Sequence, residues 1–169
     1  MENRLGDRRM TETNSTEETT PPTKVLAIAS GGGHWVQLMR LRPAFADAKV
    51  TFVTVRPTYR SDVPDEDFRV VPDATRWNKV KLLMMAAKIF WIVATVRPDV
   101  VVSTGAAPGY FAIRFGKWIG ARTCWIDSIA NAEELSLSGE QIRPHASLVL
   151  TQWPHVGEKS GVEFAGSVL

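Results

Sequence analysis

The fold is decided by Val25-Leu26-Ala27-Ile28-Ala29, which runs directly into Ser30-Gly31-Gly32-Gly33-His34. The first five residues are small or apolar and suit a buried strand, and the apolar-periodic segment after the glycines predicts a helix. Strand, tight glycine turn and helix in this order are typical of the first unit of an open parallel α/β sheet. The free N–H groups and positive dipole end of such a helix attract an anion, most often a phosphate. We therefore expect a phosphate-binding turn formed by Ser30, Gly31, Gly32 and Gly33.

The composition is that of one globular domain with a core. Of the 169 residues, 44% are hydrophobic and 22% are charged, as in ordinary soluble proteins. The formal net charge of +2 is too small to indicate nucleic-acid binding, and the sequence has no nucleic-acid-binding motif, so no such partner is expected. The single cysteine, Cys124, lies in an apolar run, which predicts a buried thiol in a reducing compartment.

The first 23 residues differ from the rest of the chain. They carry mixed charge, a Thr/Ser/Glu-rich run and Pro21-Pro22, with almost nothing apolar to bury. They also lack the apolar segment of a secretory signal. We predict a disordered tail over residues 1–23 and a single folded domain over residues 24–169.

Short apolar runs alternate with longer helical patterns through the predicted domain. Strands are predicted at 25–29, 50–55, 68–71, 100–103, 122–126, 147–151 and 162–165. Helices are predicted at 35–47 with a kink or restart at Pro43, at 78–96 and at 110–119, with a short turn or helix at 155–160. The acidic stretch 61–67 is predicted to be a mobile loop. This alternation predicts the α/β class, with a Rossmann-like doubly wound parallel sheet.

The longest apolar segment, residues 78–96, permits two interpretations. Its densest part, residues 82–96, contains Lys88 and is shorter than the about 20 apolar residues that a membrane-spanning helix needs. Lys81 and Lys88 would share one helical face, so the helix could lie in a membrane interface. It could also be a core helix that connects parallel strands, and one helix can do both.

A second glycine turn, Ser103-Thr104-Gly105-Ala106-Ala107-Pro108-Gly109, follows the predicted strand at 100–103. In an open α/β sheet, ligands bind at the carboxyl ends of the strands where the strand order reverses. Two glycine turns that flank this point favour a phosphate-bearing ligand. The residues expected to bind it in the second turn are Thr104, Gly105, Ala106 and Gly109.

Two side chains are candidate general bases. His34 begins the first helix, where a neutral imidazole can accept a proton from a hydroxyl; a capping or packing role is the alternative. Asp127 ends the fifth predicted strand and precedes Ser128 and Asn131, which are expected to bind the same ligand. A carboxylate at a strand end can also accept a proton, although exposed loop carboxylates commonly have no role. The sequence has no metal-spaced His/Cys cluster, P-loop lysine motif or nucleophile elbow, so neither a metal nor a cofactor is expected.

The first glycine turn departs from the dinucleotide-binding fingerprint. A fingerprint that starts at Gly31 needs a third glycine where Val36 stands. It also needs an acidic residue at the end of the second strand, where this chain has Arg56. NAD is therefore disfavoured, whereas Arg56 could accept a 2′-phosphate and leaves an NADP-dependent oxidoreductase as an alternative.

Four blocks of sequence, taken in order, resemble a family of glycosyltransferase subunits. The blocks are residues 29–38, 98–105, 127–131 with 135–139, and 151–154 with 166–167. The family consists of the acceptor-side, membrane-associated subunits of two-part transferases. It includes the subunit that anchors the UDP-N-acetylglucosamine transferase of dolichol-linked oligosaccharide assembly, and bacterial relatives in capsule and exopolysaccharide synthesis. Many members have Glu where Asp127 stands.

The resemblance implies the N-terminal half of a glycosyltransferase-B fold, which binds the lipid-pyrophosphate acceptor in related enzymes. It implies an acceptor-binding subunit that acts on a polyprenyl-pyrophosphate-linked saccharide, while a separate donor-binding subunit carries the UDP-sugar. His34 would be the first candidate for the base that activates the acceptor hydroxyl, and Asp127 the second. The protein would be cytoplasmic and peripheral on the inner face of the cell membrane. A non-catalytic scaffold that recruits the catalytic partner to the membrane is the alternative.

Overall fold

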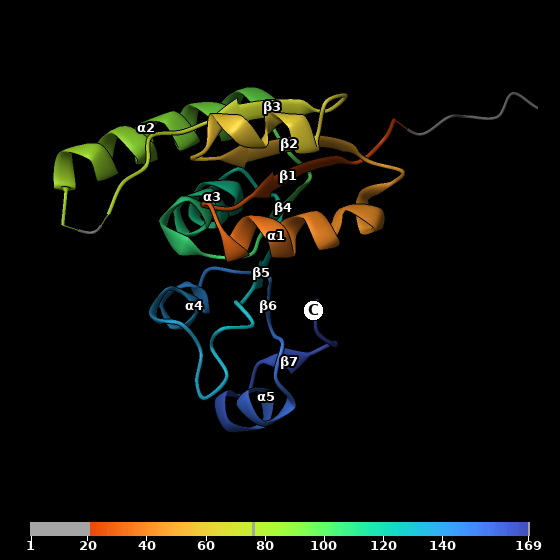
Figure 1. The fold of residues 1–169 in the computed structure, drawn as a ribbon, viewed down its shortest axis with the longest axis vertical. Helices are drawn as coiled ribbons and strands as arrows, with labels where there is room; N and C mark the ends of the chain where they lie inside the picture. Colours follow the sequence, from red (N-terminus) through yellow and green to blue (C-terminus); the bar gives the residue numbers. More distant parts are fainter. Residues whose placement is uncertain (1–20, 76, 169) are drawn as a thin grey trace, which may run out of the picture.

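The computed structural model describes residues 21–75 and 77–168. A parallel sheet in the order β3-β2-β1-β4-β5-β6-β7 runs from β3 near the top of the view in Figure 1 to β7 near the bottom. The chain order reverses where β1 pairs with β4, so the switch point of the sheet lies between these two strands. The strands are β1 (Lys24–Ile28), β2 (Lys49–Thr54), β3 (Asp67–Val70), β4 (Val100–Ser103), β5 (Arg122–Ile126), β6 (Leu148–Thr151) and β7 (Glu163–Phe164).

Helices cover both faces of this sheet. The α-helices are α1 (Gly33–Arg40), α2 (Lys79–Val96), α3 (Ala106–Trp118), α4 (Leu137–Ile142) and α5 (Pro154–Ser160), and the 3₁₀ helices are η1 (Arg42–Phe45) and η2 (Pro57–Asp62). α2 and α3 contribute Met85, Ile89 and Ile113 to one apolar cluster. α1 contributes Trp35 and Leu38 to a second cluster, and alternate residues of β1 belong to one cluster or the other. This arrangement confirms the predicted Rossmann-like doubly wound sheet.

The predicted strands are confirmed, with ends that differ by at most one residue. The predicted helix at 35–47 ends at Arg40 and restarts as η1, because Pro43 has no N–H to continue the hydrogen bonding of an α-helix. Residues 61 and 62 of the predicted loop at 61–67 belong to η2, and its last residue, Asp67, begins β3. α3 begins four residues earlier than predicted, at Ala106. The sequence pattern does not predict α4. Residues 1–20 of the predicted disordered tail lie outside the described residues.

α2 has a buried face and an exposed apolar face. Met85, Ile89 and Val93 are buried in the core, which confirms the core interpretation of this segment. The exposed face, called the α2 face below, consists of Val80, Leu83, Met84, Phe90 and Trp91. Within the described residues, no helix combines the length and the apolar character needed to cross a bilayer. The interface interpretation of the segment therefore stays a prediction.

Candidate functional site

The two glycine turns meet at the switch point of the sheet. β1 and β4 pair in parallel, with Ile28 beside Ser103. Because the carboxyl ends of parallel strands share one edge, the turn after β1 lies next to the turn after β4. The first turn leads into α1 at Gly33, so that His34 is the second residue of this helix, and the second turn leads into α3 at Ala106. The structure thus brings together the two turns that the sequence pattern predicts to bind phosphate.

A reciprocal pair of hydrogen bonds joins these turns. The Thr104 hydroxyl donates to the backbone carbonyl of His34 at 2.7 Å, and Nδ1 of His34 lies 2.9 Å from the backbone carbonyl of Thr104. A carbonyl oxygen can only accept, so Nδ1 carries the proton in this bond. In the neutral ring, Nε2 then holds a lone pair, and it makes no hydrogen bond with the described residues. His34 therefore has one nitrogen available to a ligand.

The second turn is shaped around this imidazole. Gly105 has a φ of +133°, and a Cβ there would lie 2.6 Å from both Nδ1 and Cε1 of His34. Ala106 has a φ of +65°, in the left-handed region that residues with a Cβ rarely adopt. Gly109 has a different surrounding, because a Cβ there would lie 2.9 Å from Cβ of Ser103. Packing thus explains the glycine at 109, and ligand binding by Gly109 stays a prediction.

The first turn has two neighbours from the segment that follows β2. The Gly32 N–H donates to the Tyr59 hydroxyl at 3.0 Å, and a Cβ on Gly31 would lie 3.2 Å from Cγ of Arg56. The Arg56 side chain is exposed and makes no hydrogen bond or ion pair with the described residues. A free cation therefore lies beside the turn where an anion is expected. The sequence pattern places Arg56 at a strand end but does not indicate Tyr59.

Asp127 is buried, with 2% of its surface exposed. Its carboxylate accepts four hydrogen bonds, from Trp125 Nε1 (3.0 Å), Asn131 Nδ2 (3.1 Å), the Ser136 N–H (2.7 Å) and the Ser136 hydroxyl (2.5 Å). Ser136 also begins α4, where its hydroxyl oxygen accepts from the Gly139 N–H at 2.9 Å. Asn131, a predicted ligand-binding residue, directs its amide at this carboxylate. This geometry favours an anchoring role for Asp127 over proton abstraction.

Two glutamines connect the loop after β5 to α1. Gln37 Nε2 donates to the Ser128 hydroxyl at 3.2 Å, and Gln37 Oε1 accepts from the Ile129 N–H at 3.1 Å. Gln152 Nε2 donates to Gln37 Oε1 at 2.5 Å and to the Asp127 carbonyl at 2.9 Å. Both glutamines and Ser128 are buried, so Ser128 belongs to a buried polar network. A glutamine within an otherwise apolar helix face is the sequence signal that could have indicated it.

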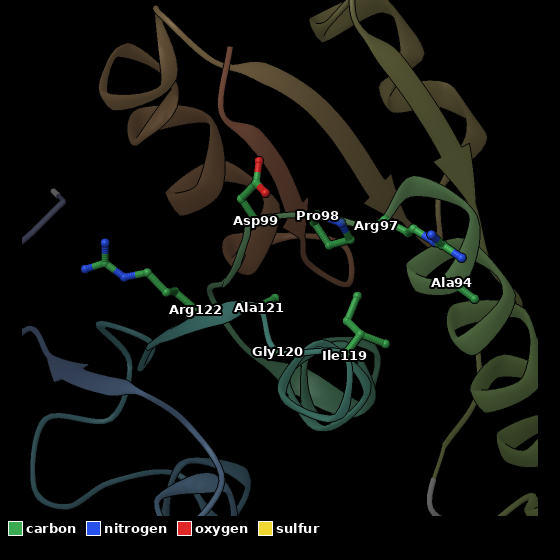
Figure 2. A pocket seen from close by; sticks show the side chains of 8 residues that line it. All are labelled: Ala94, Arg97, Pro98, Asp99, Ile119, Gly120, Ala121 and Arg122. Atoms are coloured by element: carbon green, nitrogen blue, oxygen red, sulfur yellow. The ribbon is translucent and has the colours of Figure 1, made fainter. Parts of the chain in front are cut away.

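A hollow of ≈ 650 Å³ lies away from the two glycine turns. Figure 2 shows it between the C-terminal ends of α2 and α3, with Arg97 and Arg122 on opposite sides. Asp99 and Arg122 stand where β4 and β5 begin, so the hollow is at the opposite edge of the sheet from His34. In residues 21–75 and 77–168, no group of three or more His, Cys, Asp or Glu could hold a metal ion.

The sequence comparisons decide the family. No family model matches the chain. The UDP-N-acetylglucosamine transferase subunit ALG14 of Yarrowia lipolytica is 35% identical to it over 164 residues, which cover 80% of this chain and 76% of that protein. The chain belongs to the ALG14 family. The ALG14 subunit of Eremothecium gossypii is 26% identical over 171 residues, which cover 82% of this chain and 76% of that protein.

Solved structures place this ALG14-family fold within larger proteins. MurG of Acinetobacter baumannii matches with a TM-score of 0.65 and 15% identity, over 80% of this chain and 43% of that chain. A UDP-N-acetylglucosamine 2-epimerase from Rickettsia bellii matches with a TM-score of 0.67 and 13% identity, over 87% of this chain and 45% of that chain. The ALG14-family chain thus spans less than half of each. At these identities the likeness concerns the fold alone, and it confirms the N-terminal half of a glycosyltransferase-B fold.

Proposed function

We propose that this ALG14-family chain is the acceptor-binding subunit of a two-part UDP-N-acetylglucosamine transferase that acts on a polyprenyl-pyrophosphate-linked saccharide. The observation that carries the proposal is the free Nε2 of His34, held between two glycine turns at the switch point of the sheet. The relatives are named as subunits, which supports a partner polypeptide. In the proposal this partner binds the UDP-sugar. Capsule or exopolysaccharide synthesis is the proposed setting.

In the proposed reaction, a hydroxyl of the acceptor saccharide attacks C1 of the donated sugar. A bond forms between the hydroxyl oxygen and C1, the bond from C1 to the UDP oxygen breaks, and UDP leaves with the electron pair. Nε2 of His34 takes the hydroxyl proton, a contribution that is typically about 10²–10⁴-fold in rate. Asp127 holds the loop after β5 and does not contact the acceptor hydroxyl.

In this proposal the acceptor's pyrophosphate binds at the first glycine turn. The amino end of α1 favours an anion there, and the free guanidinium of Arg56 lies beside Gly31. Arginine binds phosphate oxygens through two parallel N–H donors. Ser30, Gly31 and Gly33 keep their predicted phosphate-binding role in this proposal. The N–H of Gly32 already donates to the Tyr59 hydroxyl, so phosphate binding by Gly32 stays a prediction. In the second turn, Thr104, Gly105 and Ala106 shape the position of the base.

The α2 face is proposed to dock on the inner face of the cell membrane. α2 carries Lys79, Lys81 and Lys88 and no acidic residue. It packs against α3, which exposes Trp118 and also has no acidic residue. Exposed apolar and aromatic side chains flanked by lysines match an anionic lipid surface, because the apolar groups enter the headgroup boundary and the lysines attract the lipid charge. This placement supports a peripheral membrane protein on the cytoplasmic side.

Vesicle co-sedimentation tests the membrane proposal. The full chain should bind phosphatidylcholine vesicles that contain phosphatidylglycerol more strongly than vesicles of phosphatidylcholine alone. L83A and W91A should weaken binding to both, whereas L137A, which removes another exposed leucine from α4, should leave binding unchanged. Equal binding by L83A, W91A and wild type would contradict the proposal. A doubling of the molecular mass that W91A abolishes would show instead that the α2 face joins two copies.

A transfer assay tests the function itself. The tagged chain is purified from its host with its partner subunit and given UDP-[¹⁴C]N-acetylglucosamine and a host lipid extract. Label should enter a lipid-linked, mild-acid-labile product with the complex and not with either polypeptide alone. Transfer by this chain alone would contradict the two-part proposal. Normal transfer by an H34A complex would favour the alternative, in which the chain is a non-catalytic scaffold.

A further inference from the structure

The peptide that joins Thr104 to Gly105 is held in one orientation from both sides. Its carbonyl faces Nδ1 of His34 at 2.9 Å, and its N–H donates to the Ser103 hydroxyl oxygen at 3.1 Å. Gly105 leaves room for the ring to lie against this peptide, because a Cβ would overlap Nδ1 and Cε1. The ring therefore faces a fixed acceptor and no donor on its Nδ1 side.

A fixed acceptor selects one of the two neutral forms of histidine. The neutral imidazole has a single ring proton, and the nitrogen that carries it is set by the partner of that nitrogen. An acceptor at Nδ1 favours the form with the proton on Nδ1 and the lone pair on Nε2. A base needs its lone pair on the nitrogen that faces the hydroxyl, so the wrong form would be inactive in proton abstraction.

The Thr104 side chain is what ties this acceptor to the ring's own helix. Thr104 is fully buried, with 0% of its surface exposed. Its hydroxyl donates to the backbone carbonyl of His34 at 2.7 Å. Thr104 therefore contacts His34 twice, through its carbonyl to the ring and through its hydroxyl to the backbone. Loss of this hydroxyl would free the second turn to move relative to α1.

We propose that Thr104 is a positioning residue for His34. Its hydroxyl holds the carbonyl of the 104–105 peptide at Nδ1, which keeps the proton there and leaves Nε2 as the base for the acceptor hydroxyl. The inference rests on the proposed function for the reaction, whereas the assignment of the ring proton stands on the geometry alone.

Histidine ¹⁵N NMR of the full chain tests the assignment. The chain has three histidines, and an H34Q sample identifies the signals of His34. With the ring in its neutral form, wild type should show a protonated Nδ1 and an unprotonated Nε2. T104V should shift the population toward protonated Nε2, and T104S, which retains the hydroxyl, should restore the wild-type pattern. T51V is the matched control, because Thr51 is also buried and its hydroxyl donates to Asp67 where β3 begins, at the other edge of the sheet.

Transfer by the complex with the partner subunit gives the second readout. T104V should lower kcat by about tenfold through misdirection of the base, and T104S and T51V should stay within about twofold of wild type. A wild-type spectrum with the proton on Nε2 would overturn the inference, even if T104V failed to fold. Unchanged His34 signals in a folded T104V would also overturn it. Full transfer by H34A would overturn the proposed function instead, whatever T104V does to the signals.

Discussion

His34 and Asp127 occupy comparable places in the fold but have opposite surroundings. Each follows the carboxyl end of a strand, and each is of a residue type that can accept a proton. Among the residues that the structure describes, His34 makes one side-chain hydrogen bond and its Nε2 makes none. Asp127 has both carboxylate oxygens occupied by four donors. A titratable group near the carboxyl end of a strand can thus take part in the reaction or hold a loop in place. Its hydrogen-bond partners distinguish these two roles.

Replacement of His34 should have the largest effect of all on transfer. H34A removes the base, so kcat of the complex should fall by about 100-fold or more. The thermal midpoint of the chain should change little, since the ring is only partly buried. Single-turnover transfer and a thermal melt on the same preparation measure the two quantities. Normal transfer by the H34A complex would show that His34 is not the base.

Replacement of Asp127 should act on stability. D127N turns a pure acceptor into a group with two N–H donors, which then face the donors of Trp125 and Ser136. The free energy of unfolding should fall by about 3 kcal/mol, measured by urea denaturation. S136A, which removes one of the partners, should cost about 1 kcal/mol.

The transfer rate also distinguishes His34 from Asp127 as the candidate base. The folded fraction of a D127N complex should keep kcat within about tenfold of wild type, because no group that touches the acceptor is lost. A stable D127N protein with no transfer would show that Asp127, and not only His34, takes part in the chemistry.

Gly33 in the first turn and Gly109 in the second also differ in role, since one is proposed to bind the ligand and the other is required by packing. G109A should destabilise the fold by about 2 kcal/mol, because its Cβ would overlap Ser103 in the packed core. G33A should leave stability almost unchanged, since the nearest atom to its Cβ is Gln37 Nε2 at 3.9 Å. If the first turn binds the pyrophosphate, G33A should raise KM for the acceptor. Equal thermal midpoints for G109A and wild type would contradict the packing role of Gly109.

The regular elements could be predicted from the sequence because each carries a local signal. β2 is rich in β-branched residues, Pro43 marks the restart of the helix after α1, and both glycine turns follow apolar runs. The adjacency of the two turns followed from the order of a doubly wound sheet. α4 has no such local signal. This six-residue helix begins after Ser136, and Ser136 is held in place by a hydrogen bond to Asp127, nine residues away in the chain.

The site itself was predictable only in part. The residue types at His34 and Asp127 indicated two bases, and nothing local distinguishes them. The distinction comes from Trp125, Asn131 and Ser136, whose approach to Asp127 depends on the path of the loop. The network of Gln37 and Gln152 joins residues 115 positions apart, a separation across which no periodicity carries information.

Ionisation of Cys124 should have the smallest effect on stability, and this effect is confined to alkaline pH. Burial, and then the charge of Glu163, raise the pKa of this thiol from 9.0 to about 11. Alkylation by iodoacetamide at about pH 8 should therefore be slow in the folded chain and fast in urea, because the thiolate is the reactive form. Near pH 8 a small fraction of the thiol is ionised in the unfolded chain and almost none in the folded chain, so the effect on folding grows as the pH passes 9. Stability should fall as pH rises from 9 toward 11, where only the unfolded state is ionised. Cys124, predicted to be buried, has intermediate exposure in the structure; rapid alkylation of the folded chain would show that this partial burial does not protect the thiol.

The central claim is that this chain binds the acceptor and that its partner binds the donor. Isothermal titration of the purified full chain in detergent micelles compares a short-chain polyprenyl-pyrophosphoryl-N-acetylglucosamine with UDP-N-acetylglucosamine. We expect saturable binding of the lipid-linked sugar that R56A weakens about tenfold or more, and no binding of the nucleotide sugar at about 1 mM. Saturable binding of UDP-N-acetylglucosamine, with none of the lipid-linked sugar, would contradict it.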